Sequence, residues 1–188
     1  MDKKTAIIDV DSILWGFNDI LYEELVKSYP LMEKPDKWNI WEFYEKYDIP
    51  EEEFYKVCNK IHKNQELYKP FKYSSFLSYL LVLNDYHVVI ASCRIPETKK
   101  NLIKWLNRND IIYDEVFASL HKKHLFDKAD LVIDDSPINL IEASKRGANL
   151  ICGLLYPWNK ELSDTFMLCE DLKELIARLG ELGVIKIK

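Results

Sequence analysis

Residues 6–12 read AIIDVDS, a short apolar run that ends in two acidic residues. Buried strands of parallel sheets have this character, because helices cover both faces of the sheet and few side chains meet water. Asp9 and Asp11 stand two positions apart, so both carboxylates can project toward the same side beyond the strand. Ligands of open α/β sheets bind beyond the carboxyl ends of the strands, so this stretch predicts both a fold class and the place of a site.

Further apolar runs suit buried strands, and amphipathic helical patterns separate most of them. We predict strands over residues 5–10, 86–91, 113–118, 131–133 and 149–155. We predict helices over residues 97–109, 138–146 and 171–179, with Gly147 and Gly180 where a left-handed residue ends a helix. The alternation predicts an α/β fold with three layers: a Rossmann-like core around a mostly parallel sheet. Residues 183–188 fit either a short extra strand or a frayed end.

One stretch departs from this alternation. Residues 15–70 contain no convincing strand, only helical patterns with turns near Pro30, Pro35 and Pro50. Eleven of the 24 aromatic residues lie between positions 15 and 55, where an even spread would place about five. We therefore predict a small helical cap over residues 15–70, inserted after the first strand of a core formed by residues 1–14 and 71–188.

Composition narrows the class of protein further. A length of 188 residues fits one globular domain. The net charge of −5 argues against a polynucleotide partner, which needs a strongly cationic surface. No apolar run approaches the ~20 residues of a membrane span, and the N-terminal run is too short for a signal peptide. The four cysteines contain no CxxC pair, so we expect reduced thiols in a cytoplasmic protein, either a monomer or a homodimer.

A second acidic pair follows another apolar run. Residues 130–137 read DLVIDDSP, in which Asp134 and Asp135 end a predicted strand and a Ser-Pro pair begins a helix. Carboxylates at the end of a buried strand are costly unless positive charge lies nearby. Together with Asp9 and Asp11 they would form an oxygen-rich site suited to Mg²⁺. The alternative is an exposed pair that only caps the helix.

Two other segments supply groups that bind anions. Ser92 lies in a strand-to-helix turn, where free backbone N–H groups and a hydroxyl can hold a phosphate. The segment HKKHLFDKADL carries a lysine pair at the mouth of the pocket, where an ammonium would neutralise carboxylates and hold a phosphate oxygen. We expect Lys123 rather than Lys122 to do so, since Leu125 and Phe126 then face the core. The alternatives are that Ser92 is an ordinary turn residue and that both lysines lie on the solvent-exposed surface.

In chain order these pieces resemble the haloacid dehalogenase-like phosphatase superfamily. Its pattern is DxD after the first strand, Ser or Thr after the second, then Lys, then DD; here it reads Asp9-Val10-Asp11, Ser92, Lys123 and Asp134-Asp135, within residues 5–155. The layout is most similar to the 5'(3')-deoxyribonucleotidase family, on the segments DVDSILWGF, KWNIWEFYEKY, IASCR, ADLVIDDSP and LLYPWN.

The resemblance also suggests which residues line the substrate pocket. Phe17 matches a phenylalanine that lines the family's nucleoside pocket, and Trp41 lies in the cap region that closes over the base. The sequence departs from the family pattern at Ser12 and Ile13, which replace the usual Gly and Val or Thr. Arg94 extends the Ser92 turn and is expected to recruit additional anionic groups of a substrate.

What the resemblance implies is a Mg²⁺-dependent phosphomonoester hydrolase that acts on (deoxy)nucleoside monophosphates through an aspartyl-phosphate. Asp9 would be the nucleophile and Asp11 the general acid and base, while Ser92 and Lys123 hold phosphate oxygens. The Asp9 carboxylate, the Asp11 backbone carbonyl and Asp135 would bind Mg²⁺, with Asp134 orienting the set.

The sequence also allows other functions. The same chemistry could act on a sugar phosphate, a nucleic-acid 3' end or a phosphoprotein. A receiver-type signalling domain also gathers Asp, Ser or Thr and Lys at strand ends, but it lacks a ~55-residue insertion and places its Lys last. A non-catalytic phosphate- or nucleotide-binding module on the phosphatase fold is the third alternative.

Overall fold

A computed structural model describes residues 3–127 and 129–186 and shows one six-stranded sheet in the order β3-β2-β1-β4-β5-β6. Every strand pairing is parallel. The strands are β1 (Lys4–Ile8), β2 (Tyr86–Ser92), β3 (Glu115–Ala118), β4 (Leu131–Ile133), β5 (Leu150–Leu154) and β6 (Met167–Cys169). Apart from β6, each strand lies within or beside a predicted apolar run, so the α/β prediction is confirmed.

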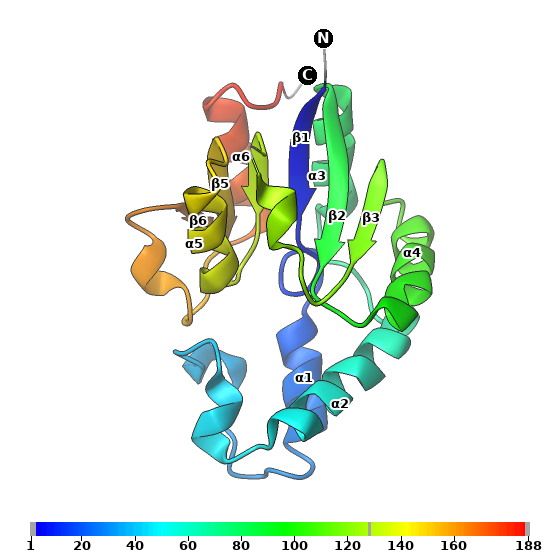
Figure 1. The fold of residues 1–188 in the computed structure, drawn as a ribbon, viewed down its shortest axis with the longest axis vertical. Helices are drawn as coiled ribbons and strands as arrows, with labels where there is room; N and C mark the ends of the chain where they lie inside the picture. Colours follow the sequence, from blue (N-terminus) through cyan, green and yellow to red (C-terminus); the bar gives the residue numbers. More distant parts are fainter. Residues whose placement is uncertain (1–2, 128, 187–188) are drawn as a thin grey trace.

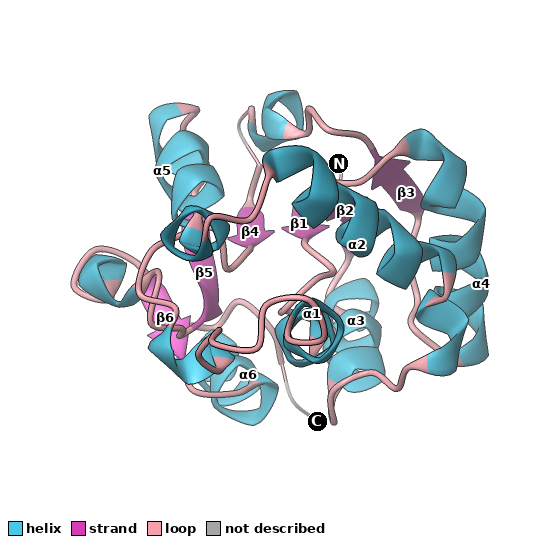
Figure 2. Ribbon diagram, turned by 90° about the horizontal axis from the view of Figure 1, so that it is seen from below, coloured by secondary structure: helices cyan, strands magenta, loops and turns pink. Residues whose placement is uncertain are grey.

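Helices cover both faces of the sheet. They are α1 (Phe17–Leu25), α2 (Glu51–Lys63), α3 (Ser74–Leu83), α4 (Lys99–Arg108), α5 (Pro137–Lys145) and α6 (Leu172–Glu181). Short 3-10 turns are η1 (Pro35–Lys37), η2 (Phe43–Tyr47), η3 (Gln65–Leu67), η4 (Pro96–Thr98), η5 (Lys123–Phe126) and η6 (Lys160–Leu162). Figure 2 shows α5 on one side of the sheet and α3 and α6 on the other. None of the described helices has the length and apolarity needed to cross a membrane.

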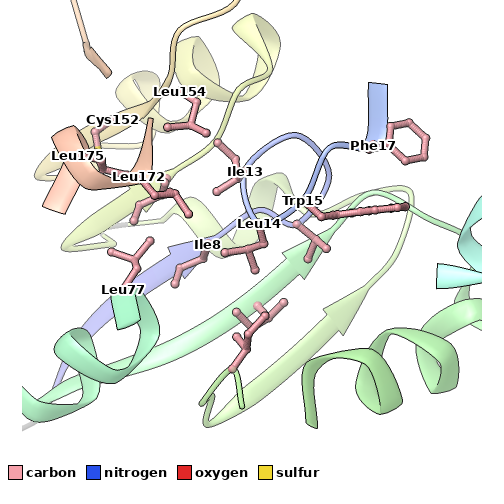
Figure 3. Close-up of a cluster of buried hydrophobic side chains, with 14 of the residues drawn as sticks. Ile8, Ile13, Leu14, Trp15, Phe17, Leu77, Cys152, Leu154, Leu172 and Leu175 are labelled. Atoms are coloured by element: carbon pink, nitrogen blue, oxygen red, sulfur yellow. The ribbon is translucent and has the colours of Figure 1, made fainter. Parts of the chain in front are cut away.

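The alternating side chains of the strands build a separate core on each face. On β1, Ile7 belongs to a cluster with Val132 and Leu140, whereas Ile8 belongs to a second cluster with Leu77 and others. Figure 3 shows that this second cluster continues from the sheet through the loop after β1 and reaches the start of α1. The loop that carries Asp9 and Asp11 is therefore held in place by apolar side chains packed on its core side.

The segment of residues 15–70 lies beyond the carboxyl ends of the strands, where Figure 1 shows α1 and α2. Its two ends meet: Trp15 and Pro70 form an antiparallel bridge, and the backbone N–H of Phe71 donates to the Leu14 carbonyl at 2.8 Å. We call residues 15–70 the cap segment. The segment therefore leaves and rejoins the core at one point, and α2 and η3 also pack against α4 of the core.

Two of the cap aromatics pack inside the cap segment itself. The rings of Trp38 and Phe43 stack with centroids 3.7 Å apart, and both side chains are buried. Such stacking supplies apolar burial for a segment that contains no strand in its described structure. These two rings therefore hold the cap segment together.

The C-terminal region differs from the prediction in two places. The sixth strand, β6, was not predicted. It has three residues at the edge of the sheet, too few to show the alternation of a strand. Helix α6 runs through Gly180, and the glycine with a left-handed φ of 69° is Gly183. The helix continues to Glu181, and beyond its end the Val184 backbone N–H donates to the Leu179 carbonyl at 2.9 Å. Residues 183–186 form no strand, and residues 187–188 lie outside the described part.

Candidate active site

The site lies at the crevice where the strand order reverses. From β1 the chain proceeds outward to β3 on one side, and from β4 it proceeds outward to β6 on the other. Connections that leave in opposite directions open a crevice at the carboxyl ends of the two central strands. Asp9 follows β1 and Asp134 follows β4, and the Asp9 backbone N–H donates to the Ile133 carbonyl at 2.8 Å. The topology thus brings together acids that are far apart in the sequence.

Three of the predicted acids form one buried group. Carboxylate oxygens of Asp9, Asp134 and Asp135 all lie within 4.8 Å of one another, and all three residues are buried. The Lys122 ammonium pairs with Asp9 and, at 2.8 Å, with Asp134. We call these four residues the acidic cluster. Three carboxyl groups face one ammonium, so ionisation of all three would leave an excess of negative charge.

The pKa values in the acidic cluster reflect that excess. Burial, together with the charges of Asp9 and Asp134, raises the pKa of Asp135 well above its ordinary value. Burial also raises the pKa of Asp9, against the opposing charge of Lys122. The pKa of Lys122 is raised because the two carboxylates outweigh its own burial, so the ammonium stays charged. A hard divalent cation would relieve this repulsion, and the all-carboxylate donor set fits Mg²⁺.

The carboxylate of Asp134 is held by several groups of the protein. Its Oδ1 accepts from the Ser136 backbone N–H at 2.9 Å, and its Oδ2 accepts from Asn139 Nδ2 at 3.1 Å and from Lys122. Ser136 also caps α5 as predicted, accepting from the Asn139 backbone N–H. These bonds fix Asp134 in place beside Asp9 and Asp135.

Two residues that we did not predict shape this strand end. A Cβ on Gly153 would lie 1.8 Å from the Asp134 carbonyl oxygen, so β5 can approach Asp134 only with glycine there. Asn159 donates through Nδ2 to the carbonyls of Asp135 and Leu154, each at 2.9 Å. Gly153 within an apolar strand was the available signal for the close approach.

The prediction that Lys123 points into the pocket is wrong by one residue. Lys123 begins η5 and is exposed, whereas Lys122 is buried and also donates to the Ala91 carbonyl at 3.2 Å. Phe126 is buried as expected. Lys122, however, is the residue that precedes the 3-10 turn, so the phase of the turn does not determine the direction of its side chain.

Asp11 turns to a different set of partners. Its carboxylate contacts His62 Nε2 at 3.0 Å, Ser92 Oγ at 3.2 Å and Arg94 Nη2 at 3.0 Å, and it accepts from Trp15 Nε1 at 2.9 Å. Burial favours its neutral form, but Arg94 and His62 outweigh burial and hold the pKa of Asp11 well below its ordinary range. Of the four carboxylates that we expected to lie together, three do, and Asp11 lies apart from them.

Arg94 is also placed differently from the expectation. It is fully buried; its Nε donates to Ser92 Oγ at 2.7 Å and its Nη1 donates to Gln65 Oε1 at 2.6 Å. With Nη2 on Asp11, each of its three nitrogens already binds a protein group. Arg94 thus neutralises Asp11 in this structure instead of facing outward to recruit a substrate anion.

We refer to Asp11, His62, Gln65, Ser92 and Arg94 as the Asp11 cluster. Two of its members, His62 on α2 and Gln65 on η3, come from the cap segment and were not predicted as site residues. Both are buried, although neither residue type is usually found in an apolar core. The only signal in the sequence was a polar pair three residues apart, next to apolar Cys58 and Ile61.

The two predicted pocket aromatics differ in exposure. Phe17 is buried and stacks on the His62 ring, with centroids 5.1 Å apart. Trp41 is 39% exposed and meets the ring of Trp158 edge-on at 6.3 Å. Trp158 in turn stacks on Tyr156 at 4.4 Å. Trp41 is therefore the one of the two whose ring is open to a ligand.

Comparison with known proteins places this arrangement among solved structures. A HAD family hydrolase from Deinococcus radiodurans R1, solved with bound phosphate and sodium, matches with a TM-score of 0.68 at 14% identity over 99% of both chains. A predicted phosphoglycolate phosphatase from Haemophilus somnus 129pt matches with a TM-score of 0.63 at 13% identity, over 95% of this chain and 98% of that one. This chain has a haloacid dehalogenase-like fold.

A third structure with this fold is a phospho-aspartyl intermediate analogue of phosphoserine phosphatase. It matches with a TM-score of 0.55 at 18% identity, over 95% of this chain and 99% of that one. No protein-family model and no curated protein sequence matches this chain. The similarity to these structures is therefore a similarity of fold, since few residues are identical.

Proposed function

We propose that this protein is a phosphomonoester hydrolase that forms an aspartyl-phosphate on Asp9. The proposal rests on one observation. Asp9, Asp134, Asp135 and Lys122 are buried and in contact at the crevice of a sheet with the haloacid dehalogenase-like fold. A carboxylate beside both an ammonium and a cation-binding acid pair suits attack on a phosphate. Similarly folded proteins solved with phosphate or as a phospho-aspartyl analogue support the same reading.

The proposed reaction has two steps. Because the pKa of Asp11 is low in the free protein, Asp11 must take up a proton from solvent before the first step. An oxygen of Asp9 then attacks phosphorus, the ester P–O bond breaks, and the departing alcohol oxygen takes that proton from Asp11. Asp11 then removes a proton from water, the water oxygen attacks phosphorus, and the bond between phosphorus and Asp9 breaks. Inorganic phosphate leaves, and both aspartates return to their starting forms.

The remaining residues hold charge in place during these steps. Lys122 takes the phosphate-binding role expected of Lys123, because it is the lysine beside Asp9, and Ser92 holds a second phosphate oxygen. The Asp9 carboxylate, the Asp11 backbone carbonyl and Asp135 would bind Mg²⁺, with Asp134 orienting them. Bound Mg²⁺ would screen the attacking carboxylate from the phosphate charge.

We propose a nucleoside monophosphate as the substrate, met as a small molecule in the cytoplasm. The exposed ring of Trp41 on the cap segment faces Trp158 of the core, and a flat base stacked on such a ring gains about 1–3 kcal/mol. The net charge of −5 disfavours a polynucleotide.

A phosphate-release screen tests both levels of this proposal. Nucleoside monophosphates, sugar phosphates and glycerol phosphate are compared with and without Mg²⁺, with the Asp9→Asn variant as the blank. We expect Mg²⁺-dependent release that is fastest with a nucleotide. Release that is fastest with a sugar phosphate would overturn the nucleotide assignment alone. The absence of release from any phosphomonoester would overturn the hydrolase.

A further inference from the structure

The cap segment reaches the proposed proton-transfer residue, Asp11, through Trp15 at its start and through two polar side chains near its end. His62 Nε2 lies 3.0 Å from Asp11 Oδ2, and Gln65 Oε1 accepts from the Arg94 guanidinium, which itself binds Asp11. Both cap residues are at most 3% exposed. Without the cap segment, Asp11 would lose its contacts with His62 and Trp15, and Arg94 would lose its contact with Gln65.

These two side chains are poorly accommodated as structural elements. His62 Nδ1 and Gln65 Nε2 are buried and have no hydrogen-bond partner among the described residues. Buried polar atoms without partners destabilise a fold, so apolar residues would suit these positions better if packing were their only role. The bonds that His62 and Gln65 do make both lead to Asp11, directly or through Arg94.

We infer that His62 is a positioning residue, through which the docked cap segment fixes the Asp11 carboxylate for transfer of a proton to the departing alcohol. Gln65 acts in the same way on Arg94. The inference rests on the proposed hydrolase function and adds to it the coupling between the cap segment and proton transfer. Asp11 Oδ2 also lies 3.2 Å from Ser92 Oγ, so the carboxylate that His62 holds is next to the proposed phosphate seat.

The chemistry of the leaving group separates positioning from a structural role. 4-Nitrophenolate leaves without help from an acid, whereas the alkoxide of benzyl phosphate needs a proton as the P–O bond breaks. The two esters have similar shapes, so their kcat/KM values differ mainly in this requirement. A residue that positions the acid affects benzyl phosphate most, while a residue that only stabilises the fold affects both alike.

The test uses the full chain with Mg²⁺ and the variants His62→Phe, His62→Gln and Ile61→Val. Phe keeps an aromatic ring against Phe17 but removes the donor, and Gln restores an N–H donor. Relative to wild type, we expect His62→Phe to lower kcat/KM for benzyl phosphate about tenfold more than for 4-nitrophenyl phosphate, because positioned acids contribute about 10²–10⁴-fold. His62→Gln should recover most of that loss.

Thermal unfolding provides the second readout. We expect His62→Phe to keep the wild-type Tm or exceed it, whereas Ile61→Val, a buried neighbour on α2, should lower Tm and leave the ratio of the two kcat/KM values unchanged. An unchanged ratio in His62→Phe, or a wild type that cleaves only 4-nitrophenyl phosphate, overturns the inference alone. A wild type that cleaves neither ester overturns the hydrolase function and the inference together.

Discussion

Asp9 and Asp11 are separated by one residue, yet they lie in opposite electrostatic surroundings. Asp9 belongs to the acidic cluster, where three buried carboxylates face one lysine. Asp11 is paired with a buried arginine and a histidine, which together with Trp15 and Ser92 occupy both of its oxygens. In the acidic cluster three carboxyl groups share one ammonium, whereas the Asp11 carboxylate is neutralised by protein groups.

The origin of the partners explains the difference. The acidic cluster comes from the core alone, with Asp9 after β1, Asp134 and Asp135 after β4, and Lys122 before η5. The Asp11 cluster combines core residues with His62 and Gln65 of the cap segment. A cation-binding group can therefore exist without the cap, whereas the surroundings of Asp11 depend on where the cap lies.

The largest expected effect comes from the nucleophile. Asp9→Asn removes the attacking oxygen while keeping the shape of the side chain, so phosphate release should fall by about 10⁴-fold or more, with a cooperative unfolding transition retained. Asp11→Asn is the matching variant in the Asp11 cluster. Its kcat/KM should fall most for substrates with poor leaving groups and fall less for 4-nitrophenyl phosphate. An Asp9→Asn variant with full turnover would contradict the division of roles between the two clusters.

The lysine pair gives the next effect. Lys122→Ala should lower kcat/KM by about 10²–10³-fold, because a buried charge-neutralising group at the developing phosphate charge is lost. It should also lower Tm, since removing one partner of a buried ion pair leaves its carboxylates unpaired. Lys123→Ala is the matched control, since its exposed side chain lies one residue away. The reverse ranking of the two variants would place the phosphate at Lys123.

The sequence predicted the acidic cluster better than the Asp11 cluster, and the reason is physical. Strand ends in a parallel sheet share one edge, so Asp9, Asp134 and Asp135 could be brought together from apolar runs alone. The direction of Lys122 depended on the start of a 3-10 turn, which shifted the prediction by one residue. Short edge strand β6 offered no period to read.

The Asp11 cluster depends on contacts that no local pattern encodes. Asp11 meets His62 across 51 positions, through the folding of the cap segment back over the sheet, and Arg94 across 83, through the pairing of β1 with β2. Arg94 was noticed as a residue of the Ser92 turn, but nothing in the sequence near it shows that its guanidinium points inward to an acid. The packing of α2 and η3 against the core determines the two partners that come from the cap segment, His62 and Gln65.

The next prediction concerns Gly153, whose close approach to Asp134 sets the position of the acidic cluster at the end of the sheet. Gly153→Ala would place a methyl group 1.8 Å from the Asp134 carbonyl oxygen, so β5 or the Asp134 strand end must shift. We expect a loss of about 2–3 kcal/mol in the free energy of unfolding, measured by denaturant titration, together with weaker Mg²⁺ binding. Gly147→Ala meets no atom within 4 Å and should cost about 1 kcal/mol for its left-handed φ alone. Equal losses in the two variants would show that the strand end adapts freely.

The smallest expected effect concerns the charge balance itself. Burial and its acidic neighbours raise the folded pKa of Asp135 above the ordinary value of 3.8, so the ionised side chain lowers stability as pH rises beyond that value. Without Mg²⁺ at neutral pH, Asp135→Asn should therefore raise the free energy of unfolding by about 1–2 kcal/mol, seen as a Tm higher by about 2–8 °C.

Added Mg²⁺ should reverse that ranking. A ligand that binds only the folded state stabilises it by about 2.7 kcal/mol at a hundred times its Kd, and Asp135→Asn should lose most of this gain. Asp164→Asn, an exposed acid with the same change in charge, should behave like wild type with and without Mg²⁺. If Asp135→Asn gains as much from Mg²⁺ as wild type does, the cation does not use Asp135. The contrast between the two clusters would then concern phosphate binding alone.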